Sequence, residues 1–229
     1  MSNVSTRFDV SEESGREASL AAARDALAEK RCIVLPTDTV YGIGADAFSP
    51  QAVAMLLAAK GRSRTMPPPV LISQSATMDG LARDIPEAAR ALAEEFWPGA
   101  LTLILHAQPS LTWDLGETKG TVALRVPDDA VALELLRHTG PLAVSSANRS
   151  GQPAAITVDE AREQLGDSVD VYLDGGARGL HPDAAPSSIV DATGERLRLV
   201  RAGALSLEQL REVVPDLLDL GEEPETAGA

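Results

Sequence analysis

The chain has 229 residues, 44% of them hydrophobic and 3% aromatic, and a formal net charge of −14 at pH 7. This length suits one α/β domain with a core of Ala, Leu, Val and Ile, and the acidic balance argues against broad electrostatic adhesion to nucleic acid. One cysteine excludes an internal disulfide and no apolar stretch reaches the ~20 residues of a membrane span, so we expect a cytoplasmic protein with no membrane contact.

The first two thirds of the chain predict alternating helices and strands. Apolar residues at helical spacing indicate a helix over 14–29, and the apolar run 32–35 indicates a buried strand. Ser49 and Pro50 suit the N-cap and first position of a helix that ends near Gly61. Further strands are expected at 70–72, 101–105, 121–126 and 142–145, and further helices at 89–97 and 128–138.

The last third predicts two more helices and a cluster of strands. Thr157 with Glu160 and Ser206 with Gln209 form capping boxes, each of which should open a helix. Late strands are expected at 169–173, 187–191 and 197–201. The whole pattern fits one twisted, open α/β sheet of mixed direction with flanking helices. We expect the domain to span 14–215, the first ten residues to be loose, and 216–229 to form an acidic, disordered tail.

A Gly-x-Gly-x-x-Ala match lies within 41–47, but it does not predict a dinucleotide site. Such a fingerprint follows a strand directly and opens a helix. Here residues 36–39 separate the strand from the glycines, and the next helix begins near Pro50. A phosphate loop ending in Gly-Lys-Ser/Thr is also absent from the sequence. We therefore reject a nicotinamide site and a phosphate-loop ATP site.

Two polar loops follow predicted strands. The segment 36–42 gathers hydroxyls, a carboxylate and a phenol, and 145–151 gathers Ser, Asn and Gly. Each can be a turn that satisfies its own backbone. Ligands of α/β sheets, however, bind beyond the carboxyl ends of strands, and small polar loops present N–H groups to anions. Both loops are candidates for a binding site.

Several cations stand out in this acidic chain. Lys60, Arg62 and Arg64 follow a predicted helix, where they either line a solvated helix end or bind phosphate. Arg125 lies inside an apolar strand and needs a partner, which is either a structural carboxylate or a substrate carboxylate. Arg201 at the end of another strand is a second such case.

Metal and nucleophile chemistry have little support. The three histidines are scattered, and with one cysteine no Cys/His metal site can be assembled, so we expect no protein metal site. Cys32 lies in an apolar run with no local base and is interpreted as a small buried hydrophobe. No Gly-x-Ser-x-Gly elbow is present.

Six segments, in this order, resemble the YrdC-like family of threonylcarbamoyl-AMP synthases in its single-domain form. They are 36–45, 60–62, 96–102, 122–127, 146–151 and 199–203, and the likeness extends over 20–212. The resemblance implies a twisted open sheet with a concave, locally positive groove. It also implies the reaction of ATP, bicarbonate and L-threonine to threonylcarbamoyl-AMP and pyrophosphate, with Mg²⁺ carried by ATP. The product would serve threonylcarbamoylation of adenosine-37 in tRNA by a separate transferase complex; direct tRNA contact stays open.

The resemblance also implies roles for individual residues. Those implied for ATP are Lys60, Arg62, Ser146, Asn148 and Arg201, the first two being catalytic. Those implied for threonine are Thr39, Thr121, Arg125, Val144 and Ser187, with Arg125 facing its carboxylate. The chain departs from the family pattern at Leu71, Ala154 and Pro186, where relatives carry His, Ser and Glu.

Two alternative functions remain. A paralogue of the same fold with a different substrate is suggested by the departures at Leu71 and Pro186. A non-catalytic RNA-binding module would use the groove without turnover, but the acidic charge and the few aromatic residues weigh against it.

Overall fold

The computed structural model describes residues 5–179 and 185–222, which fold around one mixed sheet. Its strands are β1 (Thr6–Asp9), β2 (Ile33–Leu35), β3 (Gly42–Asp46), β4 (Val70–Leu71), β5 (Ala82–Arg83), β6 (Leu101–Ala107), β7 (Thr121–Arg125), β8 (Leu142–Ser146), β9 (Val171–Asp174), β10 (Ser188–Asp191) and β11 (Arg198–Arg201). They pair in the order β1-β9-β2-β3-β8-β4-β7-β6-β10-β11, and β5 pairs with β6. Parallel and antiparallel pairs both occur, so the predicted mixed α/β sheet is confirmed.

Three helices begin at the caps that the sequence predicts. Ser49 accepts a hydrogen bond from Ala52 N, and Thr157 and Ser206 both form complete capping boxes. These contacts satisfy N–H groups that a helix start otherwise leaves unpaired. The helices are α1 (Arg16–Ala28), α2 (Pro50–Lys60), α3 (Met78–Leu81), α4 (Glu87–Phe96), α5 (Ala130–Thr139), α6 (Val158–Leu165) and α7 (Leu207–Val213).

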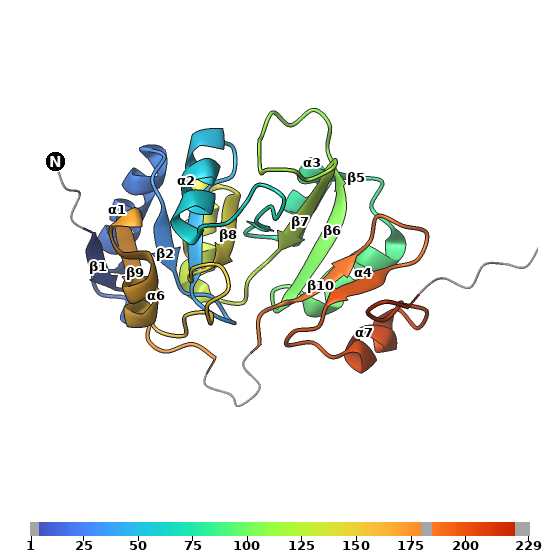
Figure 1. Ribbon diagram of the computed structural model, residues 1–229. Helices are drawn as coiled ribbons and strands as arrows, with labels where there is room; N and C mark the ends of the chain where they lie inside the picture. Colours follow the sequence, from blue (N-terminus) through green and yellow to red (C-terminus); the bar gives the residue numbers. More distant parts are fainter. Residues whose placement is uncertain (1–4, 180–184, 223–229) are drawn as a thin grey trace, which may run out of the picture.

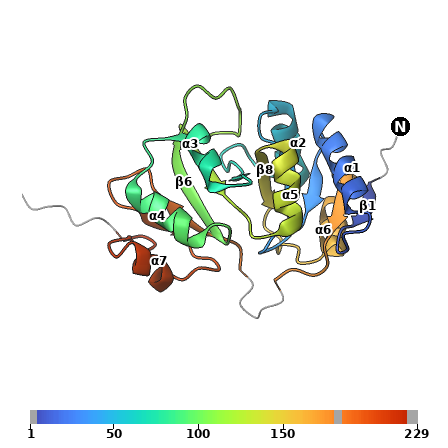
Figure 2. The same cartoon turned by 180° about the vertical axis from the view of Figure 1, so that it is seen from behind.

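The sheet has two halves joined by the short strand β4. The first half contains β1, β9, β2, β3 and β8; the second contains β7, β6, β5, β10 and β11. β4 is antiparallel to β8 on one side and parallel to β7 on the other. Helices α1, α2, α5 and α6 pack on the first half, and Figures 1 and 2 show α3 and α4 behind the second half in the view of Figure 1. The front face of the second half is therefore free to border a cleft.

Strand β3 corrects the sequence analysis, which placed Gly42 at the end of a polar loop and predicted no strand there. The segment Gly42–Asp46 instead pairs antiparallel with both β2 and β8. A Cβ atom on Gly42 would lie 2.6 Å from Cγ1 of Val144, closer than packed carbon atoms approach. The glycine is needed because Val144 of β8 packs directly against this strand.

The two ends of the domain also differ from the prediction. Strand β1 pairs in parallel with β9, so the folded unit begins before residue 14. Leu217 and Leu218 are buried, and Leu218 forms a bridge with Arg198 beside β11. The boundary predicted at 215 is thus too early, because apolar residues after it complete the core. The predicted disorder of 223–229 concerns residues outside the described part of the chain. Among the described residues, no helix is long and apolar enough to cross a membrane.

Candidate functional site

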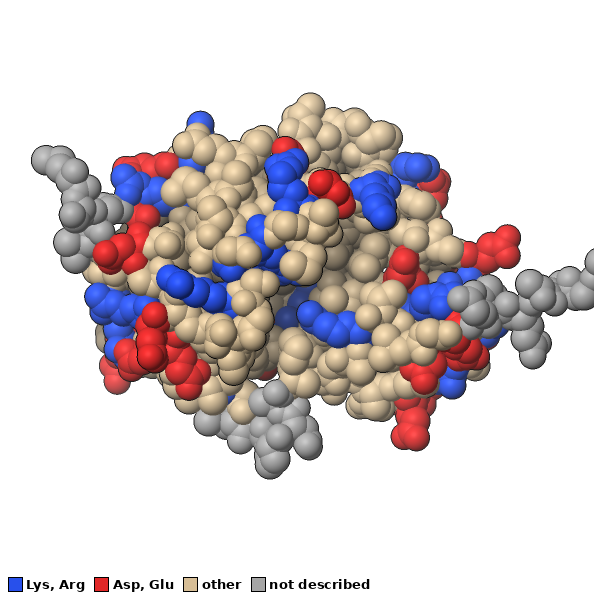
Figure 3. All heavy atoms as spheres, viewed as in Figure 1, with Lys and Arg blue, Asp and Glu red and all other residues tan. Residues whose placement is uncertain are grey.

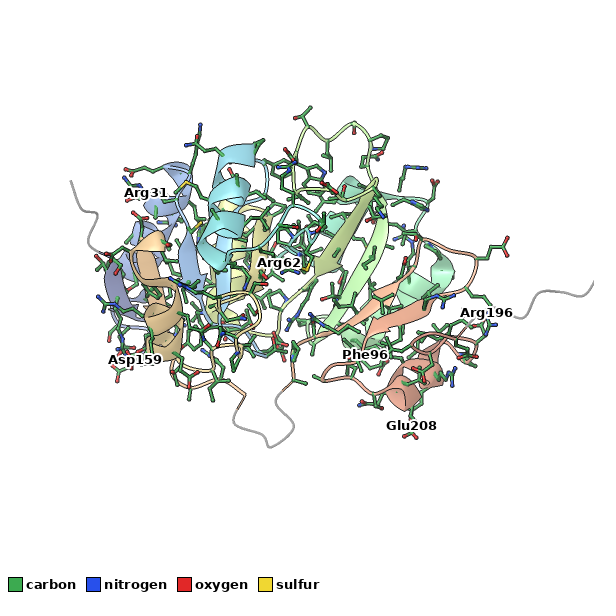
Figure 4. All side chains as sticks on the ribbon, in the orientation of Figure 1. Arg31, Arg62, Phe96, Asp159, Arg196 and Glu208 are labelled. Carbon is green, nitrogen blue, oxygen red and sulfur yellow. The ribbon has the colours of Figure 1, made fainter. Side chains whose placement is uncertain are left out.

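A cavity of about 310 Å³ lies between the two halves of the sheet. In Figure 3 this face is hollowed near its centre, where Lys and Arg gather, and Figure 4 shows Arg62 at that place. The walls come from the loop after β2, the segment after α2, the end of β8 and the open face of β6, β7 and β10. The two loops that follow β2 and β8 contribute to the walls as the sequence predicted, and the open sheet face adds a wall that it did not predict.

Two arginines without a carboxylate partner in the described structure reach the cavity from opposite halves. Arg62 follows Gly61, the left-handed C-cap of α2, and its Nη1 donates to Oγ of Ser145 at 2.9 Å. Arg201, at the end of β11, donates from Nε and Nη2 to the carbonyl oxygen of Ser187 at 3.0 and 2.6 Å. Burial lowers the pKa of both guanidinium groups, and Arg125 and Arg62 add to the lowering at Arg201. The cations are close enough to repel one another, so an anion between them would be stabilised.

Arg125 has the structural carboxylate that the sequence left as one alternative. Its Nη2 donates to Oδ1 of Asp38 at 2.6 Å, its Nη1 to Oγ1 of Thr39 at 3.1 Å, and its Nε to the carbonyl oxygen of Gly99 at 2.9 Å. A guanidinium has five N–H groups. Three are engaged here, so two remain for a further acceptor. The role of Arg125 toward a threonine carboxylate stays a prediction.

Lys60 does not line the cavity but braces the loop after β8. Its Nζ donates to the carbonyl oxygen of Ser146, to that of Asn148 at 2.6 Å and to Oδ1 of Asn148 at 3.4 Å. An ammonium has three N–H groups, so these acceptors occupy all of them. Burial lowers the pKa of Lys60 to about 8, and neighbouring Arg62 contributes to the lowering. Lys60 therefore holds the backbone at the end of β8, where Ser146 lines the cavity.

Asn148 belongs to the same brace. It is 7% exposed, and its Nδ2 donates to the carbonyl oxygens of Arg149 at 2.9 Å and Gln152 at 2.7 Å. The side chain thus closes the loop on itself and, like Lys60, is absent from the cavity wall. The two residues share one structural task, which is to fix the serines at the end of β8.

The other eight predicted residues meet in the cavity wall, although they come from distant segments. They are Thr39, Arg62, Thr121, Arg125, Val144, Ser146, Ser187 and Arg201. Ser187 accepts from Arg201 and exchanges a hydrogen bond of 2.8 Å with Thr102, while Thr121 donates to the carbonyl oxygen of Thr118 at 2.8 Å. The structure therefore brings these eight residues together, with Lys60 and Asn148 outside the wall, and the roles of all ten toward ATP and threonine stay predictions.

The sequence analysis missed several lining residues. Thr37 and Thr102 lie inside segments that carry the family resemblance, so those segments could have indicated them. Leu115 and Thr118 lie in the long connection between β6 and β7, which carries no recognisable pattern. Of the three departures from the family pattern, Leu71 and Pro186 line the cavity and Ala154 does not.

Other chemistry finds little support in the described residues. Cys32 is fully buried, as expected, and burial raises the pKa of its thiol to about 12, which disfavours a thiolate. No group of three His, Cys, Asp or Glu residues in the described part of the chain could hold a metal ion.

Comparison with known proteins finds relatives that match most of the chain. The family model of the Sua5, YciO and YrdC proteins, described as "Telomere recombination", matches residues 25–203. A Mycobacterium leprae protein named "Putative threonylcarbamoyl-AMP synthase" is 52% identical over 90% of this chain and 93% of its own length. The Bacillus subtilis "Threonylcarbamoyl-AMP synthase" is 35% identical over 90% of this chain, which spans 60% of that relative.

Solved structures share the fold over almost the whole chain. The crystal structure of Pyrococcus abyssi Sua5 complexed with L-threonine superposes with a TM-score of 0.88 at 31% identity, covering 97% of this chain and 66% of that one. Escherichia coli YciO superposes with a TM-score of 0.79 over 90% of this chain; at 21% identity it supports the fold alone.

Proposed function

Since the chain belongs to the Sua5/YciO/YrdC family, we propose that it is a threonylcarbamoyl-AMP synthase. It would join ATP, bicarbonate and L-threonine into threonylcarbamoyl-AMP and release pyrophosphate. The observation that carries the proposal is a single cavity lined by Arg62, Arg201 and several Ser and Thr hydroxyl groups. Such a site suits a polyanionic substrate beside a small polar one.

The triphosphate of ATP is assigned to the cationic side of the cavity. Arg62 and Arg201 supply planar donor forks from opposite halves of the sheet, and Ser146 supplies a hydroxyl. Lys60 and Asn148 support this side by holding the loop of Ser146 rather than by contact. Divalent magnesium would arrive with ATP and add its charge to that of the arginines.

L-Threonine is assigned to the side next to Arg125. The two N–H groups of Arg125 that remain can receive a carboxylate, and Asp38 holds the guanidinium in place. Thr39, Thr121 and Ser187 offer hydroxyls around this position, and Val144 offers an apolar contact. The Pyrococcus abyssi relative was solved as a complex with L-threonine, which supports threonine as a substrate of this chain.

The chemistry needs alignment and charge neutralisation rather than a protein nucleophile. The threonine amine adds to carbon dioxide derived from bicarbonate and gives a carbamate. A carbamate oxygen then attacks the α-phosphorus of ATP, and the bond to the β-phosphate breaks to release pyrophosphate. Negative charge gathers on the phosphates in the transition state, where preorganised arginines stabilise it.

The wider role follows from the product. Threonylcarbamoyl-AMP would serve threonylcarbamoylation of adenosine-37 in tRNA, carried out by a separate transferase complex in the cytoplasm. The names of the relatives at 34–52% identity support the synthase step. Leu71 and Pro186 in the cavity wall are the features that would favour a paralogue with another amino-acid substrate.

The test is pyrophosphate release from ATP and bicarbonate, with and without L-threonine. We expect release that depends on threonine, together with a product whose mass matches threonylcarbamoyl-AMP. Serine and other amino acids run in parallel distinguish the paralogue. Threonine-independent release, or a clear preference for another amino acid, would contradict the proposal.

The Arg62→Ala variant tests the cationic side. Loss of a preorganised charge contact lowers turnover by about 10²-fold or more. Arg90→Ala is the matched control, because Arg90 is an exposed arginine that pairs with Asp79 on the far helices; its turnover should stay within about twofold of the unmodified protein. Near-normal turnover of Arg62→Ala would contradict the assignment of Arg62 to the triphosphate.

A further inference from the structure

The connection between β6 and β7 leaves its own half of the sheet and reaches the other half. Figure 1 shows it arching above the gap between the halves. We call residues 111–118 of this connection the strap. The ring of Trp113 stacks on Phe48, before α2, with centroids 5.5 Å apart and an interplanar angle of 24°. Beside it, Nη2 of Arg64 donates to Oδ1 and Oδ2 of Asp114 at 2.7 and 2.9 Å.

The backbone of the strap also contacts Arg64. The N–H of Glu117 donates to the carbonyl oxygen of Arg64 at 2.7 Å. Gly116 has φ +109° and a Cβ atom there would lie 2.6 Å from that oxygen, so only glycine permits this approach. Oδ1 of Asp114 also accepts from Gly116 N at 3.1 Å. Arg64 is therefore gripped at both its side chain and its backbone.

Arg62 needs such support more than the other arginines of the cavity. Its guanidinium has one hydrogen-bond partner in the described structure, Ser145, and its Nε is buried without one. Arg125 by contrast is held by three groups. On its N-terminal side the Arg62 backbone is fixed by a bond from its N–H to Leu57 O at 2.9 Å. On its C-terminal side, Ser63 bonds within the described structure only to Thr65 and Met66 of the same segment. The first residue tied to another element is Arg64.

We propose that Asp114 is a positioning residue for Arg62: by gripping Arg64 it fixes the backbone from which the Arg62 side chain reaches the triphosphate. The strap itself also borders the cavity, because Leu115 and Thr118 line it. This inference rests on the proposed function, because it assigns Arg62 to ATP. An exposed ion pair contributes little to folding stability, so its loss should appear in catalysis and not in unfolding.

The experiment compares Asp114→Asn with Asp79→Asn. Both substitutions remove one negative charge from an exposed Arg–Asp pair whose closest N–O distance is 2.7 Å. We expect Asp114→Asn to lower kcat/KM for ATP about tenfold, because a misplaced catalytic group loses alignment. Asp79→Asn should stay within about twofold, and both variants should keep the melting temperature of the unmodified protein. Equal effects of the two substitutions would overturn the inference.

A second comparison tests whether Asp114 acts through Arg62. In an Arg62→Ala background, Asp114→Asn should cause no further loss, because residues that act through one another are not additive. A further tenfold loss in that background would overturn the inference. If the unmodified protein releases no threonine-dependent pyrophosphate, the proposed function fails first. In that case ATP affinity is measured by calorimetric titration for the unmodified protein, Asp114→Asn, Arg62→Ala and the double variant. Non-additive losses of affinity would still support the role of Asp114, and additive losses would overturn it.

Discussion

At the scale of single residues, the site depends on how each cation is held. Arg125 is locked by Asp38, whereas Lys60 gives its three N–H groups to the loop of Ser146 and Asn148. The sequence located both cations but could not separate contact from support, because that depends on which atoms lie within hydrogen-bond distance in the folded chain. Lys60 is 3% exposed, and an ammonium so placed must be fully bonded.

The lowered pKa of Lys60 predicts a pH effect on ATP use. Its pKa falls from 10.5 to about 8, so the amine is charged below about pH 8 and neutral above it. The neutral amine has two N–H groups and cannot keep all three acceptors, so the loop loosens as the pH rises. We expect kcat/KM for ATP to fall several-fold between pH 7 and pH 9.

The matched variant for this effect is Lys60→Arg, whose guanidinium stays charged over the whole range. The ratio of kcat/KM between the unmodified protein and the variant is measured at each pH, which cancels the titration of the substrates. This ratio should fall as the pH rises through about 8. A ratio that is constant with pH would show that the charge of Lys60 does not matter.

At the scale of elements, most helices and most strands could be predicted because their signals are local, whereas the short α3 was not predicted. Ser49 caps α2, and the boxes at Thr157 and Ser206 open α6 and α7 as the sequence indicated. Strand β3 could not be predicted, because glycine disfavours strands when it is judged alone. Gly42 belongs there only because Val144 on a strand about a hundred residues later lies against it.

This contact predicts the effect of Gly42→Ala. The new methyl group would meet Cγ1 of Val144 at 2.6 Å, and a β-branched side chain has little freedom to turn away. We expect a loss of about 1–3 kcal/mol in the free energy of unfolding, measured with urea, because overpacking forces side chains and backbone to shift. Since Val144 lines the cavity, the KM for threonine should rise as well.

Two further variants separate the clash from other effects of the added methyl. In Gly42→Ala/Val144→Ala the obstructing methyl is removed, so the double variant should lose less stability than the sum of the single variants. Gly80→Ala adds a methyl in α3 where no atom lies within 4 Å and should be neutral or slightly stabilising. Strict additivity of the two substitutions would exclude the contact as the cause.

At the scale of the molecule, the cavity exists because two half-sheets meet only through β4. Arg62 and Ser146 belong to the first half, and Thr102, Ser187 and Arg201 to the second or its approach. The chain has a net charge of −14, yet the centre of this face is cationic, because arginines from both halves converge on the cavity. The acidic residues lie mostly toward the edges of the face in Figure 3. The order of the six sequence segments predicted that these residues converge on one site. It did not predict the contacts of the strap, which carry no recognisable sequence pattern.

The extent of the folded unit leads to the last prediction. Leu217 lies beyond the boundary that charge and composition suggested, yet it is fully buried, whereas Leu220 three residues later is 51% exposed. Replacing a fully buried leucine with alanine removes apolar contacts and leaves a cavity, so Leu217→Ala should lower the free energy of unfolding by about 2–5 kcal/mol. Leu220→Ala should change it by less than about 0.5 kcal/mol. Urea unfolding of both variants measures the difference. If the two variants were equally stable, the segment after residue 215 would not pack on the core, since only a packed segment makes one leucine matter more than the other.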